Sequence, residues 1–229
     1  MVKSRHRVLV DGDTAAQLAA VAMAKRPAIA TALSDVCVYA GVFMANATRA
    51  QITARRMFWR RAWERVYYVA TRVLPVDQRV TTEEQLNAVG MVIDIEFWGG
   101  TFEQLLQINN FTLRVVPEND TQRSVASVMR RSEFPIGRAE INVARRSALI
   151  AVQTNRSYYT RYPQICDGIE VHNWKTHMAH IIAHEMVHVV RRLACANSGR
   201  AMYNDAFKNL NHWVYGHTEY TDGSETVQC

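Results

Sequence analysis

The sequence predicts an α+β fold with an N-terminal helical extension. Apolar residues recur at helical spacing through most of the first 80 residues, whereas period-two alternation appears only in short segments between residues 111 and 144. A further segment, 174–196, has no proline or glycine and places apolar side chains at helical spacing. These observations predict helices in the first part of the chain and a small sheet packed against helices in the second.

Residues 1–80 form the predicted extension. Asp13 caps a predicted helix that runs to Lys25, Pro27 opens a second helix, and a third covers 48–73. Leu74-Pro75-Val76-Asp77 then interrupts the helical pattern, which sets the predicted boundary between domains 1–80 and 81–229. Apolar residues at i, i+3, i+4, i+7, i+8 and i+11 of the third helix predict a core-facing stripe: Trp59, Ala62, Trp63, Val66, Tyr67 and Ala70.

The charge of the chain is concentrated in this extension. Residues 1–80 carry 13 Lys and Arg against 5 Asp and Glu, whereas the remaining residues carry 14 against 16. Such asymmetry predicts contact with nucleic acid or with an acidic partner. Two interpretations stay open for the arginines of the third helix, namely solvation on a packed amphipathic helix or contact with phosphates: Arg55, Arg56, Arg60, Arg61 and Arg65.

The second domain is predicted to begin with a helix at Thr82-Glu83-Glu84 that ends at Gly99-Gly100. Three strands are predicted next, at 111–116, 124–130 and 140–144. Asn173 is a candidate N-cap for the long helix 174–196, and a last helix is predicted at 202–213. Cys37, Cys166, Cys195 and Cys229 form no closely spaced pair, which excludes a zinc ribbon and favours reduced thiols.

The segment His184-Glu185-Met186-Val187-His188 lies within the long predicted helix. Histidines at i and i+4 share one helix face, so both imidazoles can bind one zinc ion. Glu185 is adjacent to the first histidine and is the candidate general base that takes a proton from a metal-bound water. His177 and His180 continue the histidine stripe, and we expect them to pack or to support the ligands rather than to bind the metal.

Several segments together resemble the SprT-like metallopeptidases, which include the Spartan proteases of DNA–protein crosslink repair. The resemblance covers about residues 82–220 and rests on Phe97-Trp98-Gly99-Gly100, the strand 111–116, Gly137-Arg138-Ala139-Glu140-Ile141-Asn142 and the His184–His188 motif. It implies a zincin-like core of helix, three-stranded sheet, HExxH helix and C-terminal helix. The tail from Tyr215 to Tyr220 is similar to phage-encoded members, and the zinc ribbon common in the family is missing.

The third metal ligand departs from the family pattern. In the family it is a histidine in an HGxxF segment, and the matching segment here is Tyr203-Asn204-Asp205-Ala206-Phe207, which places Tyr203 at the ligand position. Reasoning from the residues leaves Tyr203, Asp205, His212 and His217 as candidates. Register favours Tyr203, whereas ligand chemistry favours His217, because phenolates are uncommon zinc ligands.

The sequence therefore predicts a Zn²⁺-dependent metallopeptidase that hydrolyses peptide bonds, with nucleic-acid-associated proteins as candidate substrates. An exposed edge strand is expected to align the peptide substrate. The alternative is a non-catalytic DNA-associated or virion structural protein with a structural or vestigial zinc site. No signal peptide or transmembrane segment is recognised in the sequence, so we expect a cytoplasmic protein, in the host cytoplasm if the source is viral.

Overall fold

The computed structural model describes residues 40, 46–118, 137–143, 145–154, 162–166, 168–194 and 205–218. The strand predicted at 124–130, Tyr203 and, apart from the helical Ala40, both helices predicted before residue 46 lie outside the described residues. Within the described part the fold is α+β, as predicted. The elements in chain order are α2 (Arg49–Val73), η1 (Gln78–Val80), α3 (Glu83–Ile93), the π-helical turn η2 (Asp94–Trp98), α4 (Thr101–Ile108), β1 (Thr112–Glu118), β2 (Gly137–Asn142), β3 (Ser147–Gln153), β4 (Gln164–Cys166), β5 (Ile169–Val171), α5 (Trp174–Ala194) and α6 (Asp205–Tyr215).

The larger sheet has three strands in the order β1-β3-β2. β3 pairs in parallel with β1 and antiparallel with β2, so β2 is an edge strand of this sheet. The central strand β3 is buried along almost its whole length, with Ala148, Ile150 and Val152 fully covered. A continuous apolar run is expected of a strand that is covered on both faces.

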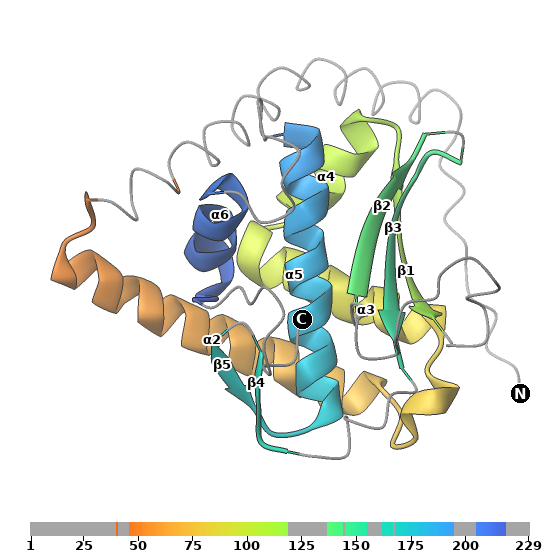
Figure 1. The fold of residues 1–229 in the computed structure, drawn as a ribbon, viewed down its shortest axis with the longest axis horizontal. Coiled ribbons are helices and arrows are strands. Elements are labelled where there is room, and N and C mark those ends of the chain that lie inside the picture. Colours follow the sequence, from red (N-terminus) through yellow and green to blue (C-terminus); the bar gives the residue numbers. More distant parts are fainter. Residues whose placement is uncertain are drawn as a thin grey trace, which may run out of the picture.

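Helix α5 crosses the centre of the molecule, with the sheet on one side and α2 and α6 on the other (Figure 1). It contacts β2, β3 and α3 as well as α2 and α6. The stripe predicted on α2 is confirmed as core, because Ala62, Trp63, Val66 and Ala70 are buried in the same apolar cluster as residues of α5. Elements on both sides of the boundary predicted at residue 80 therefore share one hydrophobic core.

Capping side chains at the N-termini of the helices explain where α2, α3 and α4 begin. Thr48 and Thr82 form capping boxes with Gln51 and Gln85 at the starts of α2 and α3. The buried Asp94 carboxylate accepts hydrogen bonds from the backbone N–H groups of Phe102 and Glu103, both at 3.0 Å, at the start of α4. Burial raises the pKa of Asp94, although these two bonds act in the opposite direction.

Several features of the described structure differ from the sequence prediction. Helix α4, strand β3 and the β4–β5 hairpin were not predicted. The predicted helix does end at Gly99-Gly100, whose φ angles of 60° and 78° are left-handed, but its last turn is the π-helical η2, and α4 begins directly after Gly100. Cys166 is buried and forms a disulfide, so the expectation of reduced thiols is wrong at this position. The other cysteines lie outside the described residues.

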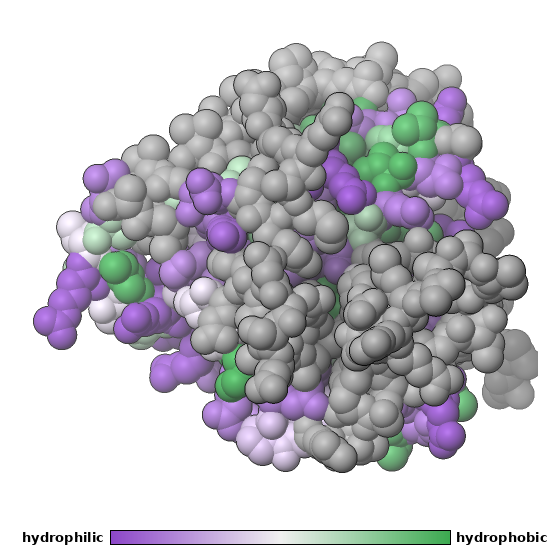
Figure 2. All heavy atoms as spheres, in the orientation of Figure 1, coloured by the Kyte–Doolittle hydropathy of each residue, from purple (hydrophilic) through white to green (hydrophobic). Residues whose placement is uncertain are grey.

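Among the described helices, none combines the length and the apolar character needed to cross a bilayer. Figure 2 shows many hydrophilic residues on the part of the surface where α2 lies, with single hydrophobic residues between them. Exposed apolar side chains on α2 include Ile52, Met57 and Tyr68.

Candidate metal centre

Helix α5 begins as the sequence predicts. The Asn173 side chain accepts hydrogen bonds from the backbone N–H groups of Lys175 and Thr176, both at 3.0 Å, and so caps the helix. Every residue from Thr176 to Arg191 is buried. Polar side chains in this stretch are therefore removed from bulk water, and their chemistry is set by the elements packed around them.

His184 and His188 lie together on α5, with exposed fractions of 2% and 3%. Their ring centres are 5.1 Å apart. Zinc–nitrogen bonds of 2.0–2.1 Å place each imidazole centre roughly 3 Å from the metal, so two rings at a tetrahedral angle are separated by about 5 Å. The spacing of this pair is compatible with a shared zinc ion.

Phe207 of α6 forms an apolar wall against both histidines. Its ring stacks on His188 at 4.2 Å between centres and lies 5.0 Å from the ring of His184. Phe207 is fully buried. An apolar wall of this kind limits water access to a metal site and lowers the local dielectric constant.

Glu185 lies where α5 meets the edge strand β2. It is 3% exposed. A Cβ atom added to Gly137 would lie 2.9 Å from Glu185 Oε1 and 2.8 Å from Ile181 Cγ2, so only glycine allows β2 to come this close to the helix. The contact brings the candidate base next to the first residue of the edge strand. Farther along α5, Arg192 donates a 2.7 Å hydrogen bond to the carbonyl oxygen of Ala139 in β2.

The other described candidates for the third ligand have different environments. No group of three or more His, Cys, Asp or Glu side chains within the described residues is arranged to hold a metal. Asp205 is exposed at the start of α6, and His212 packs against Trp59 at 5.6 Å between ring centres. Burial is the main cause of the lowered pKa of His212. Tyr203 lies outside the described residues, so its predicted role is open.

His217 belongs to a separate buried group. Its Nδ1 atom lies 3.0 Å from Asn211 Oδ1, and its Nε2 atom lies 2.9 Å from His180 Nδ1. The Nε2 atom of His180 is in turn hydrogen-bonded to the Tyr67 hydroxyl. His217 therefore joins His180 rather than the His184–His188 pair, and His180 packs and bonds within the core, as expected.

Tyr67, His180, His217 and Asn211 form a hydrogen-bond network, and the amide oxygen at one end of it determines which atom donates in each bond. An amide oxygen only accepts, so His217 Nδ1 donates to Asn211. With both histidines neutral, His180 Nδ1 then donates to His217 Nε2, and the Tyr67 hydroxyl donates to His180 Nε2. Burial raises the pKa of Tyr67, which keeps its hydroxyl protonated as this order requires. Sequence spacing did not predict this hydrogen-bond network, because its members come from α2, α5, α6 and the segment after α6.

The arginines of α2 have different environments. Arg55 donates to the carbonyl oxygen of Trp213 through Nε (2.8 Å) and Nη2 (2.6 Å), and its guanidinium lies 3.9 Å from the centre of the Trp213 ring. Arg65 pairs with Glu96 at 2.7 Å. Arg56, Arg60 and Arg61 are exposed. The five arginines thus serve at least two purposes: Arg55 and Arg65 bond to residues of other elements, whereas the other three are exposed.

Comparisons with known proteins add no assignment: no protein-family model matches the chain, and neither a curated protein nor a solved structure matches it.

Proposed function

We propose that this protein is a zinc-dependent metallopeptidase of the SprT-like type, with a zincin-like core. His184 and His188 hold the metal, and Glu185 is the general base. The observation that carries the proposal is the arrangement of these three buried residues on α5, with the histidine rings 5.1 Å apart and Glu185 against the edge strand β2.

Each residue has a defined part in this proposal. Zinc, when bound, would polarise the peptide carbonyl and increase the acidity of a bound water. Glu185 accepts the proton of the attacking water and passes it to the leaving amine. Because Glu185 is buried beside Gly137, its carboxylate is held at the start of β2. Phe207 excludes bulk water from the side of α6.

Strand β2 supplies the proposed substrate-binding edge. An extended peptide that adds to an edge strand gains main-chain hydrogen bonds with little dependence on its sequence. The carbonyl oxygen of Ala139 already accepts from Arg192. Pairing with a peptide would therefore use the other backbone groups of β2, which begins at Gly137 beside Glu185.

The alternative is a protein that retains zinc without catalysis. Two observations favour it: no third His, Cys, Asp or Glu joins the histidine pair within the described residues, and the sequence has Tyr203 at the ligand position. Catalytic zinc sites usually have three protein ligands and one open position. Cleavage of a protein substrate by zinc-loaded protein distinguishes the two functions.

Metal content is the direct test of the site. The purified full chain, supplemented with zinc and dialysed, should hold about one zinc ion per chain by mass spectrometry, as expected for a site of two histidines and a further ligand. His184→Ala and His188→Ala should each lose the metal. Glu185→Gln should retain it, because the glutamate is a base and not a ligand. His172→Ala is the matched control, because its side chain is 73% exposed on the surface.

Two results would contradict the assignment: wild-type protein without zinc after supplementation, or equal loss of zinc from the His172 and His184 variants.

A Tyr203→Phe variant tests the proposed third ligand position of the zinc site. If Tyr203 binds zinc or stabilises the developing oxyanion, its loss should lower the cleavage rate about a hundredfold or more. An unchanged rate would assign the third position to another residue.

A further inference from the structure

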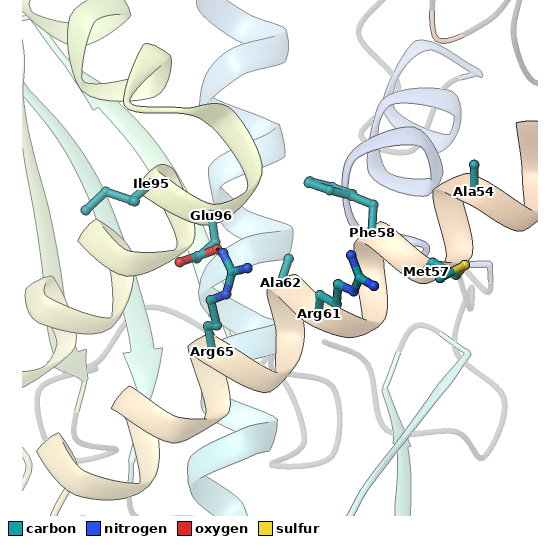
Figure 3. Close-up of a pocket in the computed structure, with 8 residues that line it drawn as sticks. All are labelled: Ala54, Met57, Phe58, Arg61, Ala62, Arg65, Ile95 and Glu96. Carbon is teal, nitrogen blue, oxygen red and sulfur yellow. Dashed lines mark hydrogen bonds and ion pairs between the residues drawn. The ribbon is translucent and has the colours of Figure 1, made fainter.

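A second surface feature, unconnected with the metal site, lies between α2 and η2 (Figure 3). It is an open groove of about 540 Å³. Its α2 wall uses residues at spacings of three and four, and one of them, Ala62, also belongs to the buried stripe. The larger side chains that line the groove are those of Met57, Phe58, Arg61, Arg65, Ile95 and Glu96.

Apolar side chains in this groove are exposed to an unusual degree for their size. Met57 is 46% exposed and Ile95 is 56% exposed. Met91, four residues before Ile95 and outside the groove lining, is 57% exposed. The Arg65–Glu96 ion pair lies between Ile95 on one side and Phe58 and Met57 on the other (Figure 3). The groove thus has two apolar ends separated by a neutralised polar centre.

The charge balance of the groove is positive. Arg65 and Glu96 neutralise each other at 2.7 Å. Arg61 lines the same groove and makes no hydrogen bond or ion pair with the described residues. One arginine is therefore available beside the apolar ends, where a guanidinium can bind a carboxylate through two parallel hydrogen bonds.

We propose that this groove docks an amphipathic helix of a partner protein, whose apolar side chains are flanked by Asp or Glu. The apolar ends take the apolar side chains of the partner, and Arg61 binds a flanking carboxylate. A helix that lies in an apolar groove buries residues at i, i+3, i+4 and i+7, which matches a groove that follows three turns of α2. Methionine side chains adapt to partners of varied shape.

The aromatic content of the groove argues against nucleic acid as the occupant. Binding of single strands relies on exposed rings on which bases stack. Phe58, the aromatic residue of the groove, is half-buried. Its ring meets Phe97 edge-on at 5.9 Å between centres, and the guanidinium of Arg55 lies 4.5 Å from the ring centre. Because Phe58 is half-buried and Arg55 already lies over its ring, it is a poor stacking platform for a base.

The test selects a displayed library of helical peptides of about 16 residues, a length of four to five turns, on the full chain. Binders that also recognise an Arg61→Glu/Ile95→Asp variant are removed. Both side chains are exposed, so the variant should keep its fold. Circular dichroism and thermal unfolding check that it does. The expected binders carry an apolar stripe at i, i+3, i+4 and i+7 with net negative charge.

The affinity of a selected peptide is then measured by fluorescence anisotropy. Arg61→Glu alone should weaken binding about tenfold or more, since reversal replaces an attraction with a repulsion at a desolvated pair. Arg60→Glu is the control and should change affinity less than about twofold, because Arg60 is outside the groove lining and near Glu64. Selection of basic or uncharged peptides, equal effects of the two reversals, or displacement of the peptide by a random single-stranded oligonucleotide would each overturn the proposal.

Discussion

Histidines of similar burial around α5 belong to two pairs with different environments. His180 and His217 bond to each other and to Tyr67 and Asn211, so their ring nitrogens have hydrogen-bonding partners within the core. His184 and His188 lie against the apolar ring of Phe207. Residue type and burial are alike in the two pairs, so the surrounding side chains decide which pair is suited to bind a metal.

Removal of the proposed base is the sharpest test at the residue scale. Glu185→Gln keeps the size of the side chain but cannot accept a proton, so cleavage of a protein substrate should fall about a hundredfold or more. Zinc content and melting temperature should stay close to those of wild type. Glu84→Gln, an exposed glutamate on α3, is the matched control and should cleave at the wild-type rate. Equal rates for the Glu185 variant and wild type would rule out the metallopeptidase.

At the scale of elements, side chains of α2 cap the C-terminal end of α6. The last carbonyl groups of a helix have no partner within the helix. Arg55 and Trp59 donate to the carbonyl oxygen of Trp213, and Trp63 donates to that of Tyr215 at 3.0 Å. The extension thereby supports the helix that carries Phe207 against the histidine pair.

The neighbours Arg55 and Arg56 provide a matched comparison of this support. Arg55→Ala should lower the free energy of unfolding by about 1–3 kcal/mol, because it removes charge-assisted hydrogen bonds and a stacked guanidinium. Arg56→Ala should change it by less than about 0.5 kcal/mol, as for most exposed positions. Urea unfolding of both variants measures the difference. Similar losses in the two variants would mean that the bonds to Trp213 contribute little.

At the scale of the whole molecule, the uneven charge distribution has a structural counterpart. Arg49, Arg56 and Arg60 are exposed on α2 at i, i+7 and i+11, which places them along one line of the helix. Arg61 and Arg65 lie on another line, in the groove. The first line is the better candidate for contact with phosphates, because its members are exposed on the first three turns of α2 and none of them lines the groove.

We propose that this line binds DNA or RNA without sequence preference. Affinity measured by fluorescence anisotropy should fall steeply between about 50 mM and 200 mM salt, because each phosphate contact releases counterions. Arg56→Glu/Arg60→Glu should weaken binding and leave cleavage of a free peptide unchanged. Arg79→Glu/Arg145→Glu makes the same change in net charge away from α2 and should have the smaller effect. Binding that is absent at the lower salt, or equal effects of the two pairs, would leave α2 as a packing element only.

Local signals predicted the helices well. Capping residues and helical periodicity located α2, α5 and the start of α3 to within about two residues, the usual uncertainty of helix ends, whereas the change from α3 to η2 after Ile93 was not predicted. Strand β3 was not predicted, because its run Ala148–Val152 has no period-two alternation when both faces are covered. Helix α4 was not predicted because its cap, Asp94, is the first residue of η2 and lies seven residues before Thr101, where α4 begins.

By itself the sequence determined the positions of α2 and α5, the α+β class and the placing of His184, Glu185 and His188 on one helix, because spacing along a helix is a local property. Only the tertiary structure decided which neighbours these residues have. The approach of β2 to Glu185, the wall formed by Phe207 and the bonding of His217 to His180 all join segments far apart in the chain. Such contacts depend on how the apolar faces of α2, α5 and α6 pack together, and no local pattern encodes that packing.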